Sequence, residues 1–545
     1  MGAGASAARM VRAPSAKHAA PLSRYEYSDS IRLAQRPAAA ARSGGRKYPH
    51  SASLTQLRPA SVHPLIRASN LNPLLMKRFA AMMLLLLAGS QVVAQPTTYQ
   101  VGTTTLTLST LTSGLNTPWE LLWGPDDFLW LTERGGRISR LDPGTGQLLP
   151  LLTLADVTQT GESGLLGIAV GPWPSPVALP GELAVYVVYN YTNAGTLKEK
   201  LVRYRYLPAT GLTAPLVLLG DLPAANVHSG SRLLLLPDGT LLMTTGDASN
   251  TSLAQNPQAL NGKILRLNLD GTVPASNPTA GSLVYTLGHR NPQGLVRVAA
   301  TGRIYSSEHG PNNDDELNLI EAGRNYGWPT VEGFCNLPAE QTFCQANNVR
   351  EPLRAWTPTR AVAGLTYYNH PAIPQWANTL LLVSLKDGAL TTLPLNASGD
   401  QLGTPADLWA GTYGRLRAIC VSPQGRVYLT TSNRDGRGAP AATDDRVFVL
   451  ENRAYTPAAT RLPSPQATLF PNPATDQVLV RIGSETTRLF HVSVTNTMGQ
   501  HVLTTQVVAN QTDATLSVAG WLPGLYFLTI SDERGTAQTA RLVIR

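Results

Sequence analysis

One arrangement of hydrophobic and polar residues recurs at four places along the chain. An apolar run meets a turn rich in Pro, Gly and Asp, a second apolar run follows, and a polar loop ends the unit. The four units span residues 121–134, 233–247, 295–308 and 419–433. Their turn residues are typical of β-hairpins. Hairpins of one pattern that recur along a chain indicate the blades of a β-propeller, because a single blade cannot bury its own faces and must stack on neighbours.

The extent of this region predicts six blades. Further short β-like runs lie at 184–191, 200–206, 263–268, 380–385 and 446–450. Roughly 350 residues between Gln95 and Asn452 suit six blades better than four or eight. Charged residues make up only 14% of the 545-residue chain, which has 47 Gly and 41 Pro, and this composition favours many short strands joined by tight turns. We therefore expect an all-β fold with a six-bladed propeller over 95–455.

Polar residues follow the second strand of each predicted hairpin. Because these loops leave equivalent strands, all of them should emerge on the same face of the propeller. The residues that would then surround one mouth are Glu133-Arg134, Asp247, Glu308-His309 and Asn433-Arg434. For most such residues a solvated turn is the simpler interpretation, so the mouth is a candidate site that needs support from other residues.

The two ends of the chain differ in composition from the propeller. Met76-Lys77-Arg78 precedes an apolar run and a small-residue cleavage position before Gln95, as in a secretory signal peptide over 76–94. Because such a peptide belongs at a terminus, the Ala/Arg/Ser-rich stretch 1–75 is either an unstructured leader or the product of a start codon placed too early. A Pro-containing linker, 456–465, precedes alternating apolar and polar residues over 466–545, which predict a small β-sandwich.

The net charge of +9 does not indicate a nucleic-acid partner. Residues before Met76 include eleven Lys and Arg against Glu26 and Asp29, so the chain after Arg78 has a net charge of −2. A basic surface for nucleic acid or an anionic membrane is therefore not expected on the folded part. No stretch approaches the roughly 20 apolar residues of a membrane-spanning helix, so we expect no transmembrane segment.

The three cysteines differ in their surroundings. Cys335 and Cys344 flank a loop short enough to close, whereas Cys420 lies in an apolar run. Export permits disulfides. We expect a Cys335–Cys344 bridge and a buried free Cys420, with three unpaired thiols as the alternative.

Loop histidines and one acidic cluster are the candidates for chemistry. The histidines within the propeller are His228, His289, His309 and His370. Alone, each is an ordinary structural or exposed residue, but together they could form a metal site or supply a general base. The run Asn312-Asn313-Asp314-Asp315-Glu316 is dense in hard oxygen ligands and suits calcium, although a solvated acidic turn is the simpler interpretation.

Three motifs resemble the soluble quinoprotein glucose and aldose sugar dehydrogenases almost residue for residue. They are Leu287-Gly288-His289-Arg290-Asn291-Pro292-Gln293-Gly294-Leu295, Ser307-Glu308-His309-Gly310-Pro311-Asn312-Asn313-Asp314-Asp315-Glu316 and Asn325-Tyr326-Gly327-Trp328-Pro329. Shorter matches extend the resemblance over essentially 100–452. The resemblance implies a propeller that uses pyrroloquinoline quinone (PQQ) and Ca²⁺ to oxidise an aldose sugar at its anomeric carbon.

The resemblance also assigns catalytic roles to three residues. His228 matches the general base that takes the proton of the anomeric hydroxyl while hydride moves to the quinone. Asp247 matches the carboxylate that orients this base and stabilises its charged form. Arg290 matches the cation beside the reacting quinone oxygen, where negative charge develops.

Further positions match contacts to the cofactor and its metal. The positions that match cofactor contacts are Glu162, Arg290, Asn291, Lys386, Arg415 and Arg417, and those that match calcium ligands are Gly310, Pro311, Glu316 and Tyr326. PQQ has three carboxylates, which guanidinium forks suit, and the alternation Arg415-Leu416-Arg417 would place both guanidiniums on one face of a strand. The carbonyls of Gly310 and Pro311 match the ligands of the catalytic calcium, whereas Glu316 and Tyr326 match a second, structural site.

Two residues depart from the pattern of the glucose dehydrogenases. Glu162 stands where those enzymes have a glutamine that touches cofactor and substrate, and Val227 stands where they have an acidic residue. Either change could alter substrate preference or cofactor affinity.

The last segment resembles the C-terminal sorting domain of the type IX secretion system. The matching motifs are Leu469-Phe470-Pro471-Asn472-Pro473-Ala474, Met498-Gly499-Gln500 and Leu522-Pro523-Gly524-Leu525-Tyr526. This resemblance implies a secreted or cell-surface protein that the type IX machinery exports after the signal peptide has directed it to the periplasm.

Two other functions compete with the dehydrogenase. A lactonase-type hydrolytic propeller would also place calcium and a histidine at its mouth, but it would not need Lys386, Arg415 and Arg417 directed inward. A non-catalytic carbohydrate-binding propeller usually lacks the base, whereas His228 is present here. The sequence names neither the sugar nor the electron acceptor. It contains no Cys-x-x-Cys-His haem motif, so electrons would pass to a separate acceptor.

Overall fold

The computed structural model describes residues 97–175, 178–179, 181–456, 466–483, 490–507, 513–532 and 537–545. The expected leader 1–75, the signal peptide 76–94 and nearly all of the linker 456–465 lie outside these residues. Within the described part of the chain, no helix is long and apolar enough to cross a membrane.

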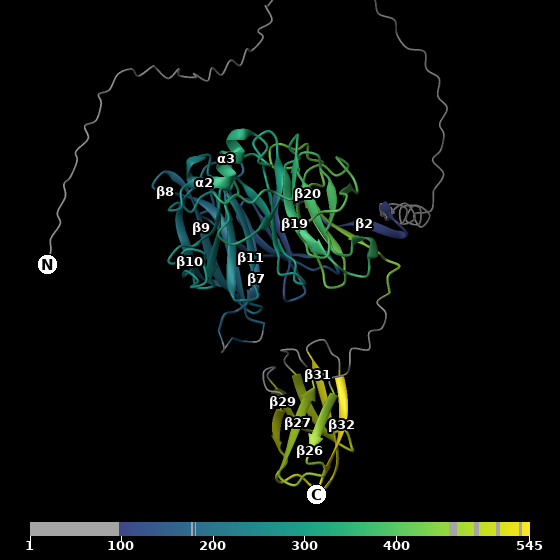
Figure 1. The fold of residues 1–545 in the computed structure, drawn as a ribbon. Coiled ribbons are helices and arrows are strands. Elements are labelled where there is room, and N and C mark those ends of the chain that lie inside the picture. The colour runs from purple at the N-terminus through teal and green to yellow at the C-terminus, as the bar shows by residue number, and fades with distance from the viewer. Residues whose placement is uncertain are drawn as a thin grey trace, which may run out of the picture. The chain divides into compact units, whose positions relative to one another are not determined.

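Six antiparallel sheets make up the described residues between 97 and 451 (Figure 1). Blade one contains β3 (Pro118–Trp123), β4 (Leu129–Glu133), β5 (Arg137–Leu141) and β6 (Leu148–Thr153), and blade two contains β7 (Leu165–Pro172), β8 (Leu183–Asn193), β9 (Thr196–Leu207) and β10 (Gly211–Pro223). Blade three contains β11 (Gly230–Leu235), β12 (Thr240–Thr245), β13 (Lys263–Asn268) and β14 (Val284–Leu287), and blade four contains β15 (Pro292–Arg297), β16 (Ile304–Glu308), β17 (Asp315–Ile320) and β18 (Arg354–Trp356). Blade five contains β19 (Val362–Tyr368), β20 (Thr379–Ser384), β21 (Leu390–Pro394) and β22 (Ala406–Asp407), and blade six contains β23 (Leu416–Val421), β24 (Val427–Thr431) and β25 (Val447–Glu451) with β2 (Thr104–Thr112). The first strand of each blade contacts the first strands of the neighbouring blades, and β23 contacts β3, so the innermost strands close a ring. The predicted six-bladed propeller is confirmed.

The sixth blade joins the two ends of the propeller. β2 pairs antiparallel with β25, so a strand from the start of this region shares a sheet with the strands that end it. β1 (Thr97–Val101) adds an edge strand beside β2. The backbone hydrogen bonds between β2 and β25 therefore tie the start of this region to its last blade. The extent of the region predicted the number of blades, but it did not show which strand closes the ring.

The four predicted hairpins are the first two strands of blades one, three, four and six. The equivalent hairpins of blades two and five are β7–β8 and β19–β20. Their connections, 173–182 and 369–378, are ten residues long. Tight-turn residues therefore do not mark these two hairpins in the sequence.

Every innermost strand of the described propeller has an irregular register against the second strand of its blade. The residues inserted at these β-bulges include Trp119 in β3, Arg232 in β11, Gln293 in β15 and Arg417 in β23. A bulge redirects a side chain and frees backbone groups from the ladder. These four side chains consequently contact one another across four different blades.

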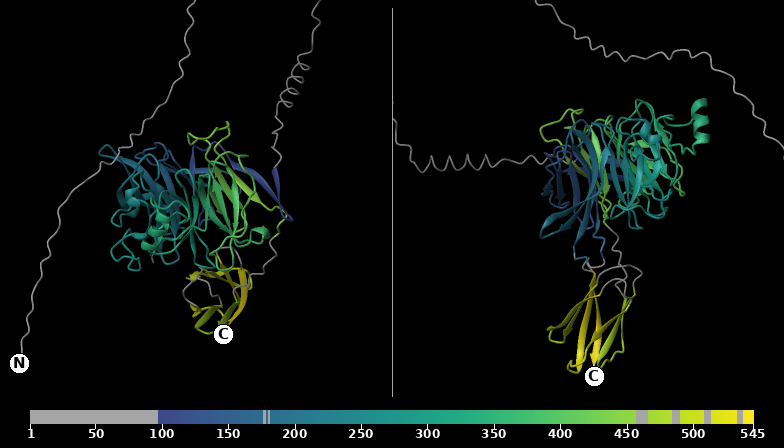
Figure 2. Two further views of the ribbon diagram at one scale, coloured as in Figure 1. Left: turned by 45° about the horizontal axis from the view of Figure 1, so that its top comes forward. Right: turned by 90° about the vertical axis from the view of Figure 1, so that its left-hand side faces the viewer.

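Short helices interrupt the loops between strands. They are α2 (Ser252–Gln255), α3 (Pro338–Ala346) and the 3₁₀ helix η1 (Pro374–Trp376). α3 projects from the body of the propeller (Figures 1 and 2). A Cys335–Cys344 disulfide closes the loop that contains α3, and Cys420 is free and buried, as predicted. Burial raises the pKa of the Cys420 thiol above its usual value, which disfavours the reactive thiolate.

The C-terminal segment forms two further sheets. One contains β26 (Gln466–Phe470), β27 (Gln477–Gly483) and β30 (Asp513–Ser517), and the other contains β28 (Phe490–Asn496), β29 (His501–Val507), β31 (Gly524–Asp532) and β32 (Ala537–Ile544). Alternate residues such as Val478, Val494 and Leu528 are fully buried in a core that both sheets share. This arrangement confirms the small β-sandwich that the alternating pattern predicted.

Candidate active site

Most of the candidate residues lie in loops at one end of the blades, whereas Glu316 and Arg417 lie within β17 and β23. In an antiparallel blade, the loop that enters the first strand and the loop that leaves the second strand lie at the same end. The residues before first strands are Glu162, His228, Arg290, Asn291 and Arg415, and those after second strands are Asp247, Gly310, Pro311 and Lys386. The topology therefore gathers residues that are far apart in the sequence. Arg134 and His309, which the sequence predicted at a common mouth, line the same cavity.

His228 is paired with a buried carboxylate. Its Nδ1 lies 2.8 Å from Oδ1 of Asp247, which also accepts the backbone N–H of Ser249 at 2.8 Å. The indole N–H of Trp328 donates to the second carboxylate oxygen at 2.9 Å. Because an ionised carboxylate only accepts hydrogen bonds, it keeps the imidazole proton on Nδ1 and leaves the lone pair of Nε2 free. The His228 side chain is 18% exposed, so the geometry is that of an accessible general base.

The backbone of His228 has a φ of +60°, a conformation that residues other than glycine rarely adopt. A polar network holds its loop in place. Glu199 of β9 accepts hydrogen bonds from the Ser231 hydroxyl at 3.0 Å and the Asn190 amide at 3.4 Å. The Asn190 oxygen accepts the Ser229 hydroxyl at 3.4 Å, so the His228 loop is tied to blade two.

Burial raises the pKa of Glu199 to about 8, so the folded protein favours its neutral form. The stability that this neutral form contributes is fully present below pH about 4.5 and is lost as the pH rises through 8. We expect Glu199→Gln, which is always neutral, to gain thermal stability relative to the wild type between pH 5 and pH 8, on the order of a few kcal/mol. Thermal unfolding of both proteins at the two pH values measures this gain, and a pH-independent difference would refute it.

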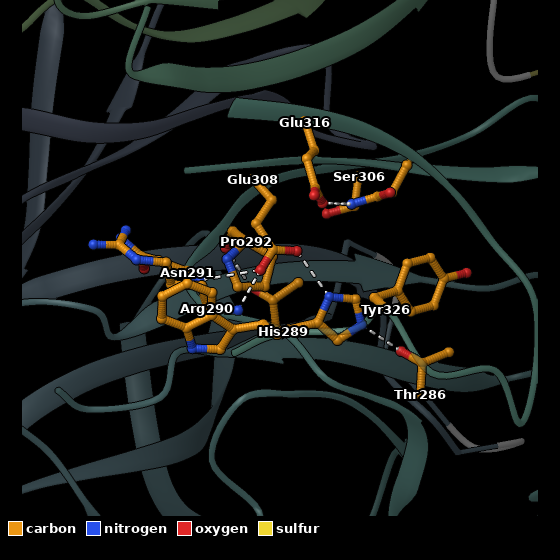
Figure 3. Close-up of polar contacts among 12 residues, drawn as sticks. Thr286, His289, Arg290, Asn291, Pro292, Ser306, Glu308, Glu316 and Tyr326 are labelled. Carbon is orange, nitrogen blue, oxygen red and sulfur yellow. Dashed lines mark hydrogen bonds and ion pairs between the residues drawn. The ribbon is translucent and has the colours of Figure 1, made fainter. Parts of the chain in front are cut away.

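A carboxylate and an imidazole hold the backbone of Arg290 and Asn291 (Figure 3). Oε1 of Glu308, at the end of β16, accepts the backbone N–H of Arg290 and that of Asn291, the latter at 3.2 Å. Its Oε2 lies 2.8 Å from Nδ1 of His289. Nε2 of His289 lies 2.8 Å from the Thr286 hydroxyl, and the ring is fully buried. His289 is therefore a structural residue of this site.

The guanidinium of Arg290 lies over the Trp328 ring, with 5.3 Å between Cζ and the ring centroid. Its Nη1 donates to the His309 carbonyl at 3.2 Å. Burial lowers the pKa of Arg290 despite the nearby carboxylates. A cation held in this way is suited to stabilise a developing negative charge.

A cavity of about 390 Å³ lies beside these groups. The charged residues that line it are Arg134, Glu162, Arg415, Arg417, Asp435 and Arg437. Arg415 and Arg417 both face it, as predicted, but their surroundings differ. Nε of Arg415 lies 2.6 Å from an Asp435 oxygen, whereas Nη1 of Arg417 donates to the neutral side-chain oxygen of Gln293 at 2.7 Å. Burial lowers the pKa of Arg417 to about 9. The volume is in the range of small-molecule sites.

The donor groups of this cavity and of the smaller cavity that Arg290 lines fit a ligand with several carboxylates. Among the described residues, neither Arg290 nor Arg417 forms an ion pair, and Nε of each is buried without a hydrogen-bond partner. A buried cation without a counter-charge is costly, so an anion that entered the cavity would be stabilised. The three carboxylates of PQQ would satisfy this requirement.

Glu162 lies close to the base. Its Oε2 accepts the backbone N–H of His228 at 3.5 Å, and its Oε1 lies 3.1 Å from Nη2 of Arg437. Burial alone would raise the pKa of Glu162, but the charges of His309, Arg437 and neighbouring groups outweigh burial and lower it. The carboxylate is therefore ionised at neutral pH.

Lys386 does not join the arginines. Its side chain is exposed, and Nζ donates to the Thr359 hydroxyl at 3.3 Å. It lines a separate hollow of about 590 Å³ with Arg360 and Asp387, although the preceding residue, Leu385, borders the arginine-lined cavity.

The predicted calcium ligands border a second, smaller cavity. Gly310, Pro311, Glu316 and Tyr326 line a space of about 10 Å³, room for one water-sized species. Burial and the charge of Glu308 raise the pKa of Glu316 to about 8. The backbone of Gly310 and Pro311 and the carboxylate of Glu316 supply the oxygen atoms that calcium prefers as ligands. The Tyr326 hydroxyl instead donates to the Leu319 carbonyl at 2.7 Å, so it is not directed to Glu316.

The four loop histidines do not form one metal site. His370 lies in the loop between β19 and β20, at the opposite end of its blade from His228. Nowhere in the described residues are three His, Cys, Asp or Glu side chains grouped so that they could hold a metal ion.

Sequence reasoning placed Glu308 and His309 at the mouth without a specific role, and it did not single out Gln293, Asp435 and Arg437, which line the cavity. Gln293, Glu308 and His309 lie inside the family motifs, which was an available signal. Asp435 and Arg437 lie in the loop after β24, and no spacing in the sequence connects them to Arg415 or Glu162.

Comparisons with known proteins identify the family of each of the two folded segments. Residues 115–439 match the family model described as glucose/sorbosone dehydrogenase, and residues 468–545 match that of the secretion system C-terminal sorting domain. Quinoprotein glucose dehydrogenase B of Acinetobacter calcoaceticus is 31% identical over 410 residues, which cover 59% of this chain and 84% of that protein. Aldose sugar dehydrogenase YliI of Escherichia coli is 28% identical over 353 residues, which cover 61% and 91%.

Solved structures show the same propeller. The PQQ-bound form of aldose sugar dehydrogenase from Streptomyces coelicolor is 33% identical, with a TM-score of 0.54, and the match covers 64% of this chain and 98% of that one. The apo form of the soluble aldose sugar dehydrogenase from Escherichia coli is 26% identical, with a TM-score of 0.55 and coverage of 64% and 100%.

Fold, site and comparisons together define a β-propeller oxidoreductase. The chain belongs to the glucose/sorbosone dehydrogenase family, and its last segment is a secretion-system sorting domain, as the sequence motifs predicted. The sorting domain supports a secreted or cell-surface location.

Proposed function

We propose that this protein is a PQQ- and calcium-dependent sugar dehydrogenase that oxidises an aldose at its anomeric carbon to the lactone. The observation that carries the proposal is the His228–Asp247 pair near two buried guanidiniums that have no carboxylate partner. Arg417 lines the cavity of about 390 Å³, and Arg290 lines the smaller cavity that shares His309 with it. The hydrolytic and the carbohydrate-binding alternatives give no reason for such an anion site.

His228 acts as the general base in this proposal. Bound PQQ would supply the acceptor for the hydride of the anomeric carbon. Nε2 of His228 takes the proton of the anomeric hydroxyl in the same step, and Asp247 stabilises the imidazolium that forms. Arg290 stabilises the negative charge that develops on the acceptor oxygen. The sugar loses a hydride and a proton, and the lactone is the product.

The remaining residues hold the cofactor and its metal. Asn291, Arg415, Arg417, Lys386 and Glu162 form the cofactor site, and Lys386 must turn from Thr359 to take part. The carbonyls of Gly310 and Pro311 would hold the catalytic calcium, which would supply a Lewis acid. Glu316, with the backbone of Tyr326, contributes to a structural calcium site. A separate acceptor removes the electrons.

The experiment that tests this function is aldose-dependent dye reduction by the purified protein. We expect no activity without PQQ, activity after PQQ and Ca²⁺ are added, and loss of activity when a chelator removes the metal. Equimolar binding of PQQ, followed by its absorbance, provides a second readout. If the protein binds no PQQ and reduces no dye across a panel of aldoses, the proposed function is wrong.

We further propose the domain order and export route that the sequence suggests. A leader or untranslated stretch, 1–75, precedes the signal peptide 76–94, the dehydrogenase propeller 95–455, the linker 456–465 and the sorting domain 466–545. The match of the last segment to a sorting domain supports export by type IX machinery. Deletion of 466–545 should retain active enzyme in the periplasm, whereas unchanged secretion would contradict this route.

A further inference from the structure

The amide of Gln293 connects two residues of the proposed cofactor site. Gln293 is 5% exposed and lies at the bulge of β15, on the wall of the arginine-lined cavity. Its Oε1 accepts Nη1–H of Arg417 at 2.7 Å. Its Nε2 donates to Oδ1 of Asn291 at 2.9 Å. One side chain thus contacts both an anion-binding guanidinium and a predicted cofactor contact.

The direction of these hydrogen bonds follows from Arg417. A guanidinium has only donors, so the Gln293 oxygen must face Arg417. The Gln293 nitrogen must then face Asn291, and only the oxygen of Asn291 can accept from it. The backbone N–H of Gly230 donates to the same Asn291 oxygen at 3.1 Å. The orientation of the Asn291 amide is therefore determined.

This orientation leaves donors unused. Nδ2 of Asn291 and Nε of Arg417 are both buried without a hydrogen-bond partner in the described structure. Buried polar groups are rarely left unpaired, so each nitrogen requires an acceptor. If the Asn291 amide were reversed, its oxygen would be presented instead, and a ligand rich in carbonyl and carboxylate oxygens would be repelled.

A buried layer below the cavity fixes Gln293 itself. Because the bulge frees the Gln293 carbonyl from the sheet ladder, it accepts Nε–H of Arg232 at 2.7 Å. Arg232 forms an ion pair with Glu120 of β3. The Trp119 ring contacts two guanidiniums, with its centroid 4.4 Å from Cζ of Arg232 and 5.7 Å from Cζ of Arg417. Three other blades therefore hold the amide in place.

We propose that Gln293 is a positioning residue that sets the hydrogen-bonding polarity of the cavity, so that Asn291 and Arg417 both present donors to an anionic quinone. The inference rests on the proposed function. Gln293 acts through Asn291 and Arg417 and need not touch the reacting atoms.

The test is the affinity of the calcium-loaded full chain for PQQ, measured by quenching of tryptophan fluorescence. We expect Gln293→Leu, in which leucine has a similar volume but no polar side-chain atoms, to raise the Kd for PQQ about 10- to 100-fold. The reason is that Arg417 and Asn291 are then no longer held in the orientation in which they donate hydrogen bonds to the anionic quinone. Gln424→Leu is the matched control and should bind like the wild type, because Gln424 is exposed in the β23–β24 turn at the other end of its blade.

A double-mutant cycle separates positioning from a general structural role. In the Asn291→Ala background, Gln293→Leu should raise the Kd by a factor several times smaller than in the wild type. An equal factor in both backgrounds, or wild-type affinity of Gln293→Leu, would overturn the inference while the proposed function stands. If the wild type itself binds no PQQ, the proposed function fails first and the inference with it.

Discussion

Replacement of His228 by alanine is expected to lower kcat by about 10²- to 10⁴-fold, which is the usual contribution of a general base. The imidazole is the group whose free Nε2 can take the anomeric proton, because Asp247 occupies Nδ1 at 2.8 Å. The anion-binding guanidiniums are untouched, so PQQ affinity should stay within a few-fold of the wild type. Steady-state dye reduction and a PQQ titration on the same preparation measure both quantities.

The matched control for this variant is His370→Ala. His370 is a loop histidine at the opposite end of its blade, and its Nδ1 accepts the backbone N–H of Ala372 at 3.1 Å. The His370→Ala protein should keep the wild-type kcat. If His228→Ala keeps more than a tenth of the wild-type kcat at saturating sugar, His228 is not the base.

Replacement of Arg290 by methionine is expected to lower kcat by about 10²- to 10³-fold, similar to the loss of one oxyanion-hole donor. The guanidinium is held between the Trp328 ring and the His309 carbonyl, so its charge is fixed before the reaction starts. The loss should appear in the reduction of bound PQQ by sugar. Stopped-flow absorbance in a single turnover measures that step apart from electron transfer to the dye.

Arg297→Met provides the comparison, because Arg297 ends the same strand, β15, far from the bulge. In the Arg297→Met protein, sugar should reduce bound PQQ at the wild-type rate. An Arg290→Met protein that reduces bound PQQ at an unchanged rate, but binds it more weakly, would make Arg290 a binding residue only.

The sequence by itself determined the features that a few neighbouring residues encode. Turn chemistry such as Pro237-Asp238-Gly239 marked the hairpins of four blades, and alternation marked the C-terminal sandwich. Continuous apolar runs fit strands buried on both faces, as in β8. The motifs around Arg290 and Gly310 identified the family. Each signal is local, because hydrogen bonding in a tight turn and side-chain direction along a strand depend on adjacent residues.

Only the tertiary structure decided which charges in the site remain free. Arg415 and Arg417 are two residues apart and look equivalent in the sequence, but Asp435 neutralises the first and Gln293 faces the second. Lys386 matches the same role and turns to Thr359 instead.

The ring closure and the bulges also depended on the tertiary structure. β2 reaches β25 from more than three hundred residues away, and the bulges of four inner strands bring Trp119, Arg232, Gln293 and Arg417 into contact. A bulge breaks the two-residue period on which a reading of strands relies. Contacts of this kind depend on how the blades stack. The free energy that selects them comes from burial and charge pairing between residues that are distant in the sequence, and a local sequence pattern contains no information about such pairs.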